Sequence, residues 1–317
     1  MSNRICAFNF KAFYKIVVIQ RMKIFSFFLI CMITSFSSVG QTIFKNTNKI
    51  LSERWLIHDD STQLLKVMPY KPVYILFANY TTDINKRPTS PNPENTVPTA
   101  TDFYNTEFKF QLSFKSRVAK KIFGNQIGGD LWVGYTQSSR WQLYSASISR
   151  PFRETNYEPE LMLVFPTPYK IFGFDGVLSG IGINHQSNGK SDPFSRSWNR
   201  VVLQFGWERP SWSVVLRPWW RLPEDDIDDS NPDIQDFIGR GELLSTFSKG
   251  RHDLSVVAKH SLRGGSKNRG SVRLDYAFKI LDNLQILAQV FHGYGENLID
   301  YNHKQTTFGV GISIIQW

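Results

Sequence analysis

The chain has very few cysteines. Only Cys6 and Cys31 occur among its 317 residues, and both lie within the first 40 positions. A disulfide framework and a cysteine-ligated metal site are therefore excluded for the rest of the sequence. Residues 41–317 must obtain their stability from another source.

The chain also lacks an apolar run long enough for a membrane-spanning helix. The run at residues 24–33 has ten residues, whereas a transmembrane helix needs about 20. Ser38 and Gly40 follow it, and they place small residues at the two positions that a signal peptidase reads. We predict a signal peptide over residues 1–40, with Met22 as the candidate start, and a single domain over residues 41–317.

Excess positive charge is largely confined to this signal segment. The whole chain has a formal net charge of +10, but the segment holds five basic residues and no acidic ones, so +5 remains for residues 41–317. A nucleic-acid-binding surface would need a strong basic excess on the folded domain. We therefore predict no nucleic-acid partner.

Residues 41–317 show apolar and polar residues in alternation, in segments of about ten residues. In one of them Phe108, Phe110, Leu112 and Phe114 alternate with polar residues. The predicted strands are 108–115, 131–137, 141–147, 160–166, 176–187, 201–207, 211–218, 237–247, 253–261, 272–278, 284–294 and 306–316. Single-chain outer-membrane barrels have an even number of strands, and a count of about twelve is typical of them.

A soluble β-sandwich or a lipocalin-like barrel would alternate in the same way. Aromatic residues make up 15% of the chain, and they cluster at strand ends, as in LRPWWRL at residues 216–222. Such clusters are typical of the aromatic girdles of membrane barrels, and the last strand also ends in an aromatic residue, Trp317. We predict an all-β, transmembrane, antiparallel up-and-down β-barrel of about 12 strands in the bacterial outer membrane.

Three polar residues interrupt rows that would otherwise be apolar. Side chains two apart on a strand share a face, so His185 and Ser187 continue the apolar row of Ile181 and Ile183. Asn199 continues the row of residues 201–207 in the same way. A His-x-Ser pair in a strand usually serves packing or hydrogen bonding, but polar side chains facing lipid are costly and tend to be functional.

These three residues supply the parts of a catalytic triad. If the hairpin turns near Asp192 and Pro193, His185 and Asn199 lie opposite each other, with Cβ atoms about 5 Å apart. Ser187 would then be the nucleophile, His185 its base, and Asn199 the group that orients the imidazole. A neutral third member avoids placing a bare charge against hydrocarbon.

The segment NHQSNGKSDPFSRSWNR at residues 184–200 resembles the active-site segment of the outer membrane phospholipase A family. PFRETNYEP at residues 151–159 is also similar to that family. The resemblance implies the same three roles for Ser187, His185 and Asn199. It further implies that the backbone amide of Gly189 forms part of the oxyanion hole.

The resemblance also implies calcium dependence and a homodimer that shares each metal ion across its interface. The implied ligands are the Lys190 carbonyl, the Ser195 oxygen and waters from one subunit, with Ser149 from the other. Gln137 matches a glutamine of the family that bonds its counterpart at the dimer interface. The family has a second calcium site, for which Asp192 is the better-placed ligand here. For its other acidic ligand, in the loop at residues 224–233, the sequence leaves Asp228 and Asp229 as alternatives, as well as a loop that is simply solvated.

The activity implied is that of a calcium-dependent phospholipase A that hydrolyses acyl esters of glycerophospholipids and lysophospholipids, at the first or second position. Its partners would be the phospholipid substrate, the outer-membrane bilayer and a second copy of the chain. Two alternatives remain at this stage. One is a non-catalytic barrel of the porin or adhesin type, and the other is a different lipid-modifying barrel such as a lipid A deacylase.

Overall fold

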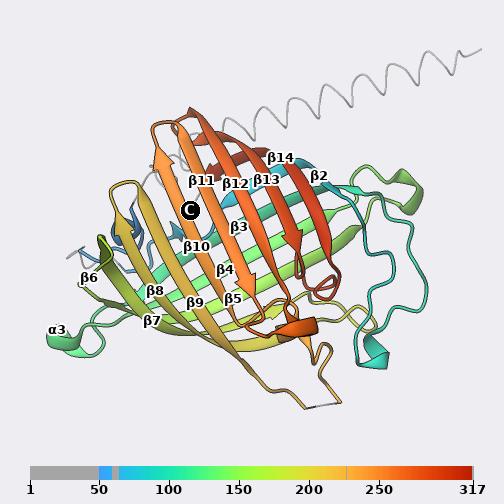
Figure 1. Cartoon of the computed structure of the whole chain (residues 1–317), viewed down its shortest axis with the longest axis horizontal. Coiled ribbons are helices and arrows are strands. Elements are labelled where there is room, and N and C mark those ends of the chain that lie inside the picture. Colours follow the sequence, from blue (N-terminus) through green and yellow to red (C-terminus); the bar gives the residue numbers. More distant parts are fainter. Residues whose placement is uncertain (1–49, 59–63, 226, 316–317) are drawn as a thin grey trace, which may run out of the picture. The chain divides into compact units, whose positions relative to one another are not determined.

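Twelve strands close an antiparallel barrel in the computed structural model of this chain (Figure 1). The structure describes residues 50–58, 64–225 and 227–315. The predicted signal peptide and Trp317 therefore lie outside the described residues. No helix within the described ranges is long and apolar enough to cross a membrane.

Strands that follow one another along the chain pair side by side, and β14 pairs with β2 to close the barrel. The barrel strands are β2 (Val73–Thr81), β3 (Thr106–Ala119), β4 (Asp130–Trp141), β5 (Phe152–Pro166), β7 (Phe174–Ser187), β8 (Ser197–Arg209), β9 (Trp212–Leu222), β10 (Gly241–Lys249), β11 (His252–His260), β12 (Gly270–Leu281), β13 (Leu284–Gly293) and β14 (Gln305–Ile315). Two short strands, β1 (Met68–Pro69) and β6 (Lys170–Ile171), pair with β3 and β7.

Within the described residues, the helical elements are single turns. They are α2 (Leu51–Arg54), α3 (Gly124–Ile127), η1 (Pro93–Asn95), η2 (Ala146–Ile148), η3 (Ile234–Asp236) and η4 (Gly265–Lys267). At one end of the barrel the strands are joined mostly by short turns, such as residues 210–211. The other end carries longer loops, including residues 82–105, 188–196 and 223–240. In outer-membrane barrels the longer loops lie on the extracellular side.

The predicted fold class is confirmed, but the strand predictions need correction in three places. Residues 237–240 precede β10 rather than belonging to it, because they continue the turn that follows η3. Residues 142–147 are not part of a strand, because Gln142 is buried there and bonds Tyr104 and Glu107, and the chain then turns through η2. Strand β2 is absent from the predicted set. That strand alternates poorly because its inward face carries apolar Tyr74 and Leu76, which pack in a small cluster inside the barrel.

The barrel is apolar outside and polar inside. On β3, Lys109 and Lys115 point inward and are 3% and 1% exposed, whereas Leu112 and Phe114 point outward and are 50% and 45% exposed. A soluble sandwich or lipocalin-like barrel would bury its apolar row instead. This inside-out pattern matches a sheet whose outer face contacts lipid.

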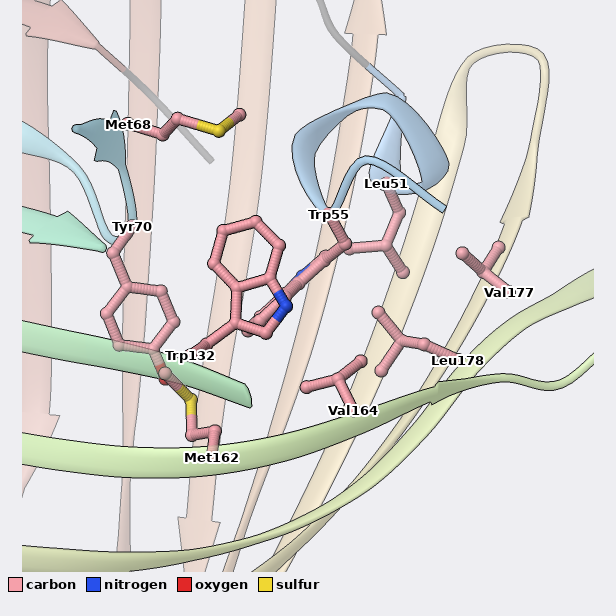
Figure 2. Close-up of a cluster of buried hydrophobic side chains, with 9 residues drawn as sticks. All are labelled: Leu51, Trp55, Met68, Tyr70, Trp132, Met162, Val164, Val177 and Leu178. Carbon is pink, nitrogen blue, oxygen red and sulfur yellow. The ribbon is translucent and has the colours of Figure 1, made fainter. Parts of the chain in front are cut away.

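An apolar plug lies inside the barrel at the short-turn end (Figure 2). Trp55 follows α2 and packs edge-on against Trp132, with ring centroids 5.4 Å apart. The Lys115 ammonium lies 3.0 Å from the Trp55 ring centroid, so a cation–π contact replaces a hydrogen bond there. Glu208, near the end of β8, accepts hydrogen bonds from the Ser52 amide and hydroxyl and anchors α2.

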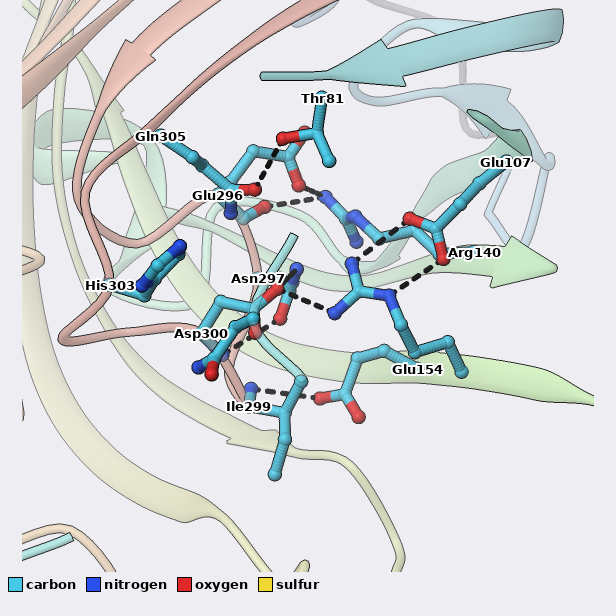
Figure 3. A network of polar contacts seen from close by, with 12 residues as sticks. Thr81, Glu107, Arg140, Glu154, Glu296, Asn297, Ile299, Asp300, His303 and Gln305 are labelled. Carbon is cyan, nitrogen blue, oxygen red and sulfur yellow. Dashed lines mark hydrogen bonds and ion pairs between the residues drawn. The ribbon is translucent and has the colours of Figure 1, made fainter. Parts of the chain in front are cut away.

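Charged residues fill the opposite end, where the loop at residues 294–304 folds against the inner wall (Figure 3). Arg153 bonds both Glu107 (2.6 Å) and Asp300 (2.7 Å), all of them buried. Burial alone would raise the pKa of Asp300, but the ion pair with Arg153 outweighs it and the pKa is lowered. Glu154 accepts a hydrogen bond from the Ile299 amide. This network fixes the start of β5, next to the loop that carries the candidate site.

Candidate active site

The three predicted catalytic residues lie together where β7 ends and β8 begins, at the long-loop end of the barrel. His185 is directly opposite Asn199 in the β7–β8 pair, as the sequence predicts. The Nδ1 atom of His185 lies 2.8 Å from the Oδ1 atom of Asn199. The Asn199 oxygen can only accept, so this bond fixes the tautomer in which Nδ1 carries the proton and Nε2 is free to act as a base.

These side chains point away from the barrel interior. Ile181 and Ile183, which share their face, are 46% and 56% exposed, whereas Asn184 on the other face is 1% exposed. His185 is exposed and Ser187 half-buried. The predicted outward orientation is therefore confirmed.

A polar cavity of about 110 Å³ lies on the other side of the sheet, inside the barrel. Its lining includes Lys71, Glu158, Glu242 and Gln186. Because Gln186 points into the interior, its chain neighbours on either side point outward. The candidate site thus faces the bilayer side of the wall rather than this cavity.

Ser187 ends β7, and Gly189 follows it in the loop. The Gly189 amide donates a hydrogen bond to the Ser187 hydroxyl oxygen over 3.1 Å. Gly189 has φ +62°, a left-handed conformation that glycine adopts without strain. A Cβ atom there would also lie only 3.2 Å from the Tyr157 ring, so glycine is favoured at this position for both reasons. Among the described residues, no hydrogen bond joins Ser187 to His185. Catalytic hydrogen bonds are often long in the absence of substrate and tighten when it binds.

The loop between the two strands is organised by Asn188, which the sequence analysis did not single out. Its side chain is 3% exposed, accepts hydrogen bonds from the amides of Lys190 (3.3 Å) and Arg196 (3.0 Å), and donates to the Phe194 carbonyl (2.8 Å). An asparagine that bonds the amide two residues later is a known turn former, and this was the available sequence signal. A backbone bond from Phe194 to Ser191 closes the turn, which contains Asp192 and Pro193 as expected.

Arg196 is a second residue that the sequence analysis missed. Its guanidinium is fully buried and donates to the carbonyls of Thr89, Asn95, Pro193 and Ser195 at 2.7 to 3.2 Å. These bonds tie the loop at residues 188–196 to the loop at residues 82–105. The candidate site is therefore held by contacts that lie about 100 positions apart in sequence.

The structure places three of the expected metal ligands in the same loop. Lys190, Asp192 and Ser195 lie within it, and the Lys190 carbonyl and Ser195 hydroxyl accept no hydrogen bond within the described ranges. One carboxylate oxygen of Asp192 accepts a hydrogen bond from Asn95 Nδ2 (2.6 Å). Two neutral oxygens and one carboxylate suit Ca²⁺, which prefers hard oxygen ligands and readily keeps waters.

Ser149 does not join this group. It lies in the loop between β4 and β5 and adopts a left-handed conformation with φ +63°. The described residues hold no cluster of three or more histidine, cysteine or acidic side chains arranged to bind a metal. Ca²⁺ takes about six to eight oxygen ligands, so the oxygens of Lys190 and Ser195 would need waters or ligands from elsewhere to complete a site.

The two acidic candidates in the loop after β9 differ in their surroundings. Asp229 is buried and paired with Arg221 at 2.6 Å, and it also accepts a hydrogen bond from the Asn231 amide. Asp228 is exposed. The Asp229 carboxylate thus stabilises its own loop, and the exposed Asp228 carboxylate is the more accessible of the two to a metal ion.

Gln137 lies on the outward face of β4 at the same height as Ser187. Tyr157 on β5 pairs with Gln137 on one side and with Ser187 on the other. Gln137 is half-buried, and its side chain accepts a hydrogen bond from the Tyr135 hydroxyl (3.2 Å). A polar amide is therefore exposed on the lipid-facing wall two strands from the candidate nucleophile.

Comparison with known proteins gives consistent matches. The sequence profile of a family described as Phospholipase A1 matches residues 51–314. The putative phospholipase A1 of Neisseria meningitidis serogroup B is 38% identical over 259 residues, which cover 80% of this chain and 66% of that protein. The phospholipase A1 of Escherichia coli K12 is 37% identical over 247 residues, covering 78% of this chain and 80% of that protein.

Solved structures are similar as well. The outer membrane phospholipase A of Escherichia coli aligns with a TM-score of 0.72 and 33% identity, covering 84% of this chain and 97% of that one. The outer membrane phospholipase of Salmonella typhi, solved as a dimer with bound calcium, has a TM-score of 0.72 and 33% identity, covering 84% and 98%.

Proposed function

Because the chain belongs to the phospholipase A1 family, whose solved members include outer membrane phospholipase A barrels, we propose that it is a calcium-dependent phospholipase active as a homodimer. It lies in the bacterial outer membrane and hydrolyses acyl esters of glycerophospholipids and lysophospholipids. The observation that supports this most is the 2.8 Å contact between His185 and Asn199 beside Ser187, on the outward face of the barrel.

Ser187 performs the nucleophilic attack. Its hydroxyl oxygen bonds the ester carbonyl carbon while its proton passes to Nε2 of His185. His185 then gives that proton to the leaving alcohol oxygen, and an acyl-serine remains. Water attacks this ester next, with His185 again taking the proton, and the fatty acid leaves as Ser187 regains its hydrogen.

Asn199 and Gly189 stabilise charge during these steps. Asn199 holds the imidazole so that Nε2 faces Ser187, and its oxygen dipole supports the imidazolium. The Gly189 amide, which bonds Ser187 at 3.1 Å, is close enough to the reacting centre to donate to the developing oxyanion. Since a fixed negative charge against hydrocarbon costs several kcal/mol, a neutral third member suits this position.

The loop at residues 188–196 offers the metal site. The Lys190 carbonyl and the Ser195 hydroxyl are hard donors for the shared calcium ion, and Asp192 is the donor for a second one. All three lie on one short loop that Asn188 and Arg196 hold in shape. When bound, Ca²⁺ supplies Lewis-acid stabilisation to the negative charge of the tetrahedral intermediate. Few protein ligands make such a site weak, so metal occupancy can set the level of activity.

A second copy of the chain completes this arrangement. Gln137 presents an amide on an apolar wall, where it would bond its counterpart in the second copy. The interface would then include Tyr157 and adjoin Ser187, because the three positions form one row across β4, β5 and β7. Ser149 from the second copy supplies the ligand that one chain lacks.

A comparison of two lipids tests the proposed substrate. Purified protein in mixed micelles with calcium is expected to release fatty acid from phosphatidylethanolamine and none from lipid A, as measured by chromatography of the free acids. Release from lipid A alone would instead indicate a deacylase. Release from neither lipid would indicate a non-catalytic barrel of the porin or adhesin type.

A further inference from the structure

The far side of Asn199 contacts an acidic residue. The Asn199 Nδ2 atom donates a hydrogen bond to Oε1 of Glu224 over 3.0 Å, while its Oδ1 faces His185 at 2.8 Å. Leu222, the last residue of β9, is paired with Asn199. Glu224 lies two residues beyond that pair, so its side chain reaches back over the strand end.

The contact is specific within the loop. Among the described residues, Asn199 is the hydrogen-bond donor to Glu224. The nearby Arg221 is instead directed to Asp229 at 2.6 Å and to the carbonyls of Asn231 and Pro232. Glu224 therefore bonds Asn199 of the triad, while Arg221 bonds other partners and acts on the Glu224 carboxylate only through its charge.

An acceptor behind Asn199 has two physical consequences. First, a side-chain amide can be rotated so that either its oxygen or its nitrogen faces a partner, and an acceptor on one side forces the oxygen to the other side. Second, hydrogen bonds in a chain polarise one another, so the Asn199 oxygen facing His185 becomes more negative. Both effects favour the imidazolium that forms during catalysis.

We propose that Glu224 is a positioning residue of the active site, which orients Asn199 and supplies through it the negative charge that the triad itself lacks. The inference rests on the proposed hydrolase function. It extends the triad to a relay from Glu224 through Asn199 and His185 to Ser187. The charge lies in the loop beyond β9, so it is kept out of the membrane-spanning wall.

The charges around Glu224 are mixed. Burial raises the pKa of its carboxyl and Asp229 adds to this, whereas Arg221, the Asn199 hydrogen bond and His185 act in the opposite direction; the net shift is upward. Its negative charge is consequently lost at a higher pH than that of an ordinary glutamate. The relay is therefore complete only above that raised pKa.

Glu224→Gln tests the relay, because glutamine keeps an acceptor for Asn199 and removes only the charge. We expect kcat/KM for phosphatidylethanolamine to fall about fivefold. The acidic limb of its pH profile should move to lower pH, because the protonated base loses a stabilising charge. Glu224→Asp keeps the charge, so the acidic limb of its pH profile should stay at the wild-type pH.

Asp225→Asn is the matched control. It removes the same charge from the next residue, which is exposed, and should leave both the rate and the limb unchanged. An unmoved limb in Glu224→Gln would overturn the inference, because a purely structural role does not shift it. So would a loss that excess calcium restores, since Glu224 would then be a metal ligand. The wild type in the same assay keeps the two proposals apart: if it releases no fatty acid with calcium, the hydrolase proposal itself fails, whereas an active wild type with an unmoved limb in Glu224→Gln overturns the relay alone.

Discussion

Ser187→Ala is expected to reduce fatty-acid release from phosphatidylethanolamine micelles by about 10⁴-fold or more, because the reaction loses the oxygen that forms the acyl intermediate. Other members of the relay cannot compensate, since His185 then has no hydroxyl to deprotonate. The measurement is the initial rate of fatty-acid release at saturating calcium, with wild type and variant in the same detergent.

The fold provides a close control for this change. Ser197 is directly paired with Ser187 across β7 and β8. Ser197→Ala therefore removes the same atom from the neighbouring position and should retain wild-type activity. Both variants should keep the heat-dependent gel mobility of a folded barrel, since neither hydroxyl belongs to the interior network. Activity that survives in Ser187→Ala would show that another residue is the nucleophile.

Removing calcium is expected to lower the same rate by about 100-fold, because the oxyanion loses its Lewis acid. Added Ca²⁺ should restore the rate after chelation. Mg²⁺ at the same concentration should not, since it requires near-octahedral geometry and releases its waters reluctantly. Full activity in excess chelator would contradict the metal site proposed around Lys190 and Ser195.

Dimer formation can be measured directly in the same experiment. Crosslinking in detergent should yield more dimer with calcium and substrate than with chelator. Gln137→Leu should weaken dimer formation by roughly tenfold, which corresponds to the 1–2 kcal/mol of an interhelical polar contact in lipid. Because the proposed metal is shared between two copies, weaker dimer formation should also raise the calcium concentration needed for half-maximal activity, even though Gln137 is not a proposed ligand. Unchanged crosslinking in Gln137→Leu would place the interface elsewhere.

The architecture was largely predictable because the outer wall of a membrane barrel imposes a strict alternation. The row through Ile181, Ile183 and His185 could be assigned to the outward face from parity alone, and the turn residues Asp192 and Pro193 then fixed the pairing of His185 with Asn199. The pairing register of two strands follows from their hydrophobic pattern wherever one face of the sheet meets lipid.

Prediction failed where the interior departs from that pattern. The inner face of β2 carries Tyr74 and Leu76 instead of polar residues, so its alternation is weak and the strand was missed. Residues 141–147 alternate well, yet Gln142 is drawn into hydrogen bonds with Glu107 and Tyr104, and the strand ends at Trp141. Alternation of apolar and polar residues indicates which side a residue faces only where the chain is part of the sheet.

Residues that support the site were harder to foresee than those proposed to react. Arg196 acts through carbonyls in the loop at residues 82–105, and Glu224 reaches Asn199 from the loop after β9. The Arg196 contacts join loops that lie about 100 positions apart in sequence, and the Glu224 contact depends on the register of the β8–β9 pair. An acidic run such as residues 224–229 reads as a solvated loop until its neighbours in space are known.

We propose that Ser187 meets lipid directly from the outer wall of the barrel. Labelling with a long-chain alkyl sulfonyl fluoride tests it, because the serine oxygen displaces fluoride from sulfur and keeps the label. Mass spectrometry of the digested protein should find the alkylsulfonyl group on Ser187, and the His185→Ala variant should remain unlabelled. A label on another residue, or equal labelling of the His185→Ala variant, would contradict the claim.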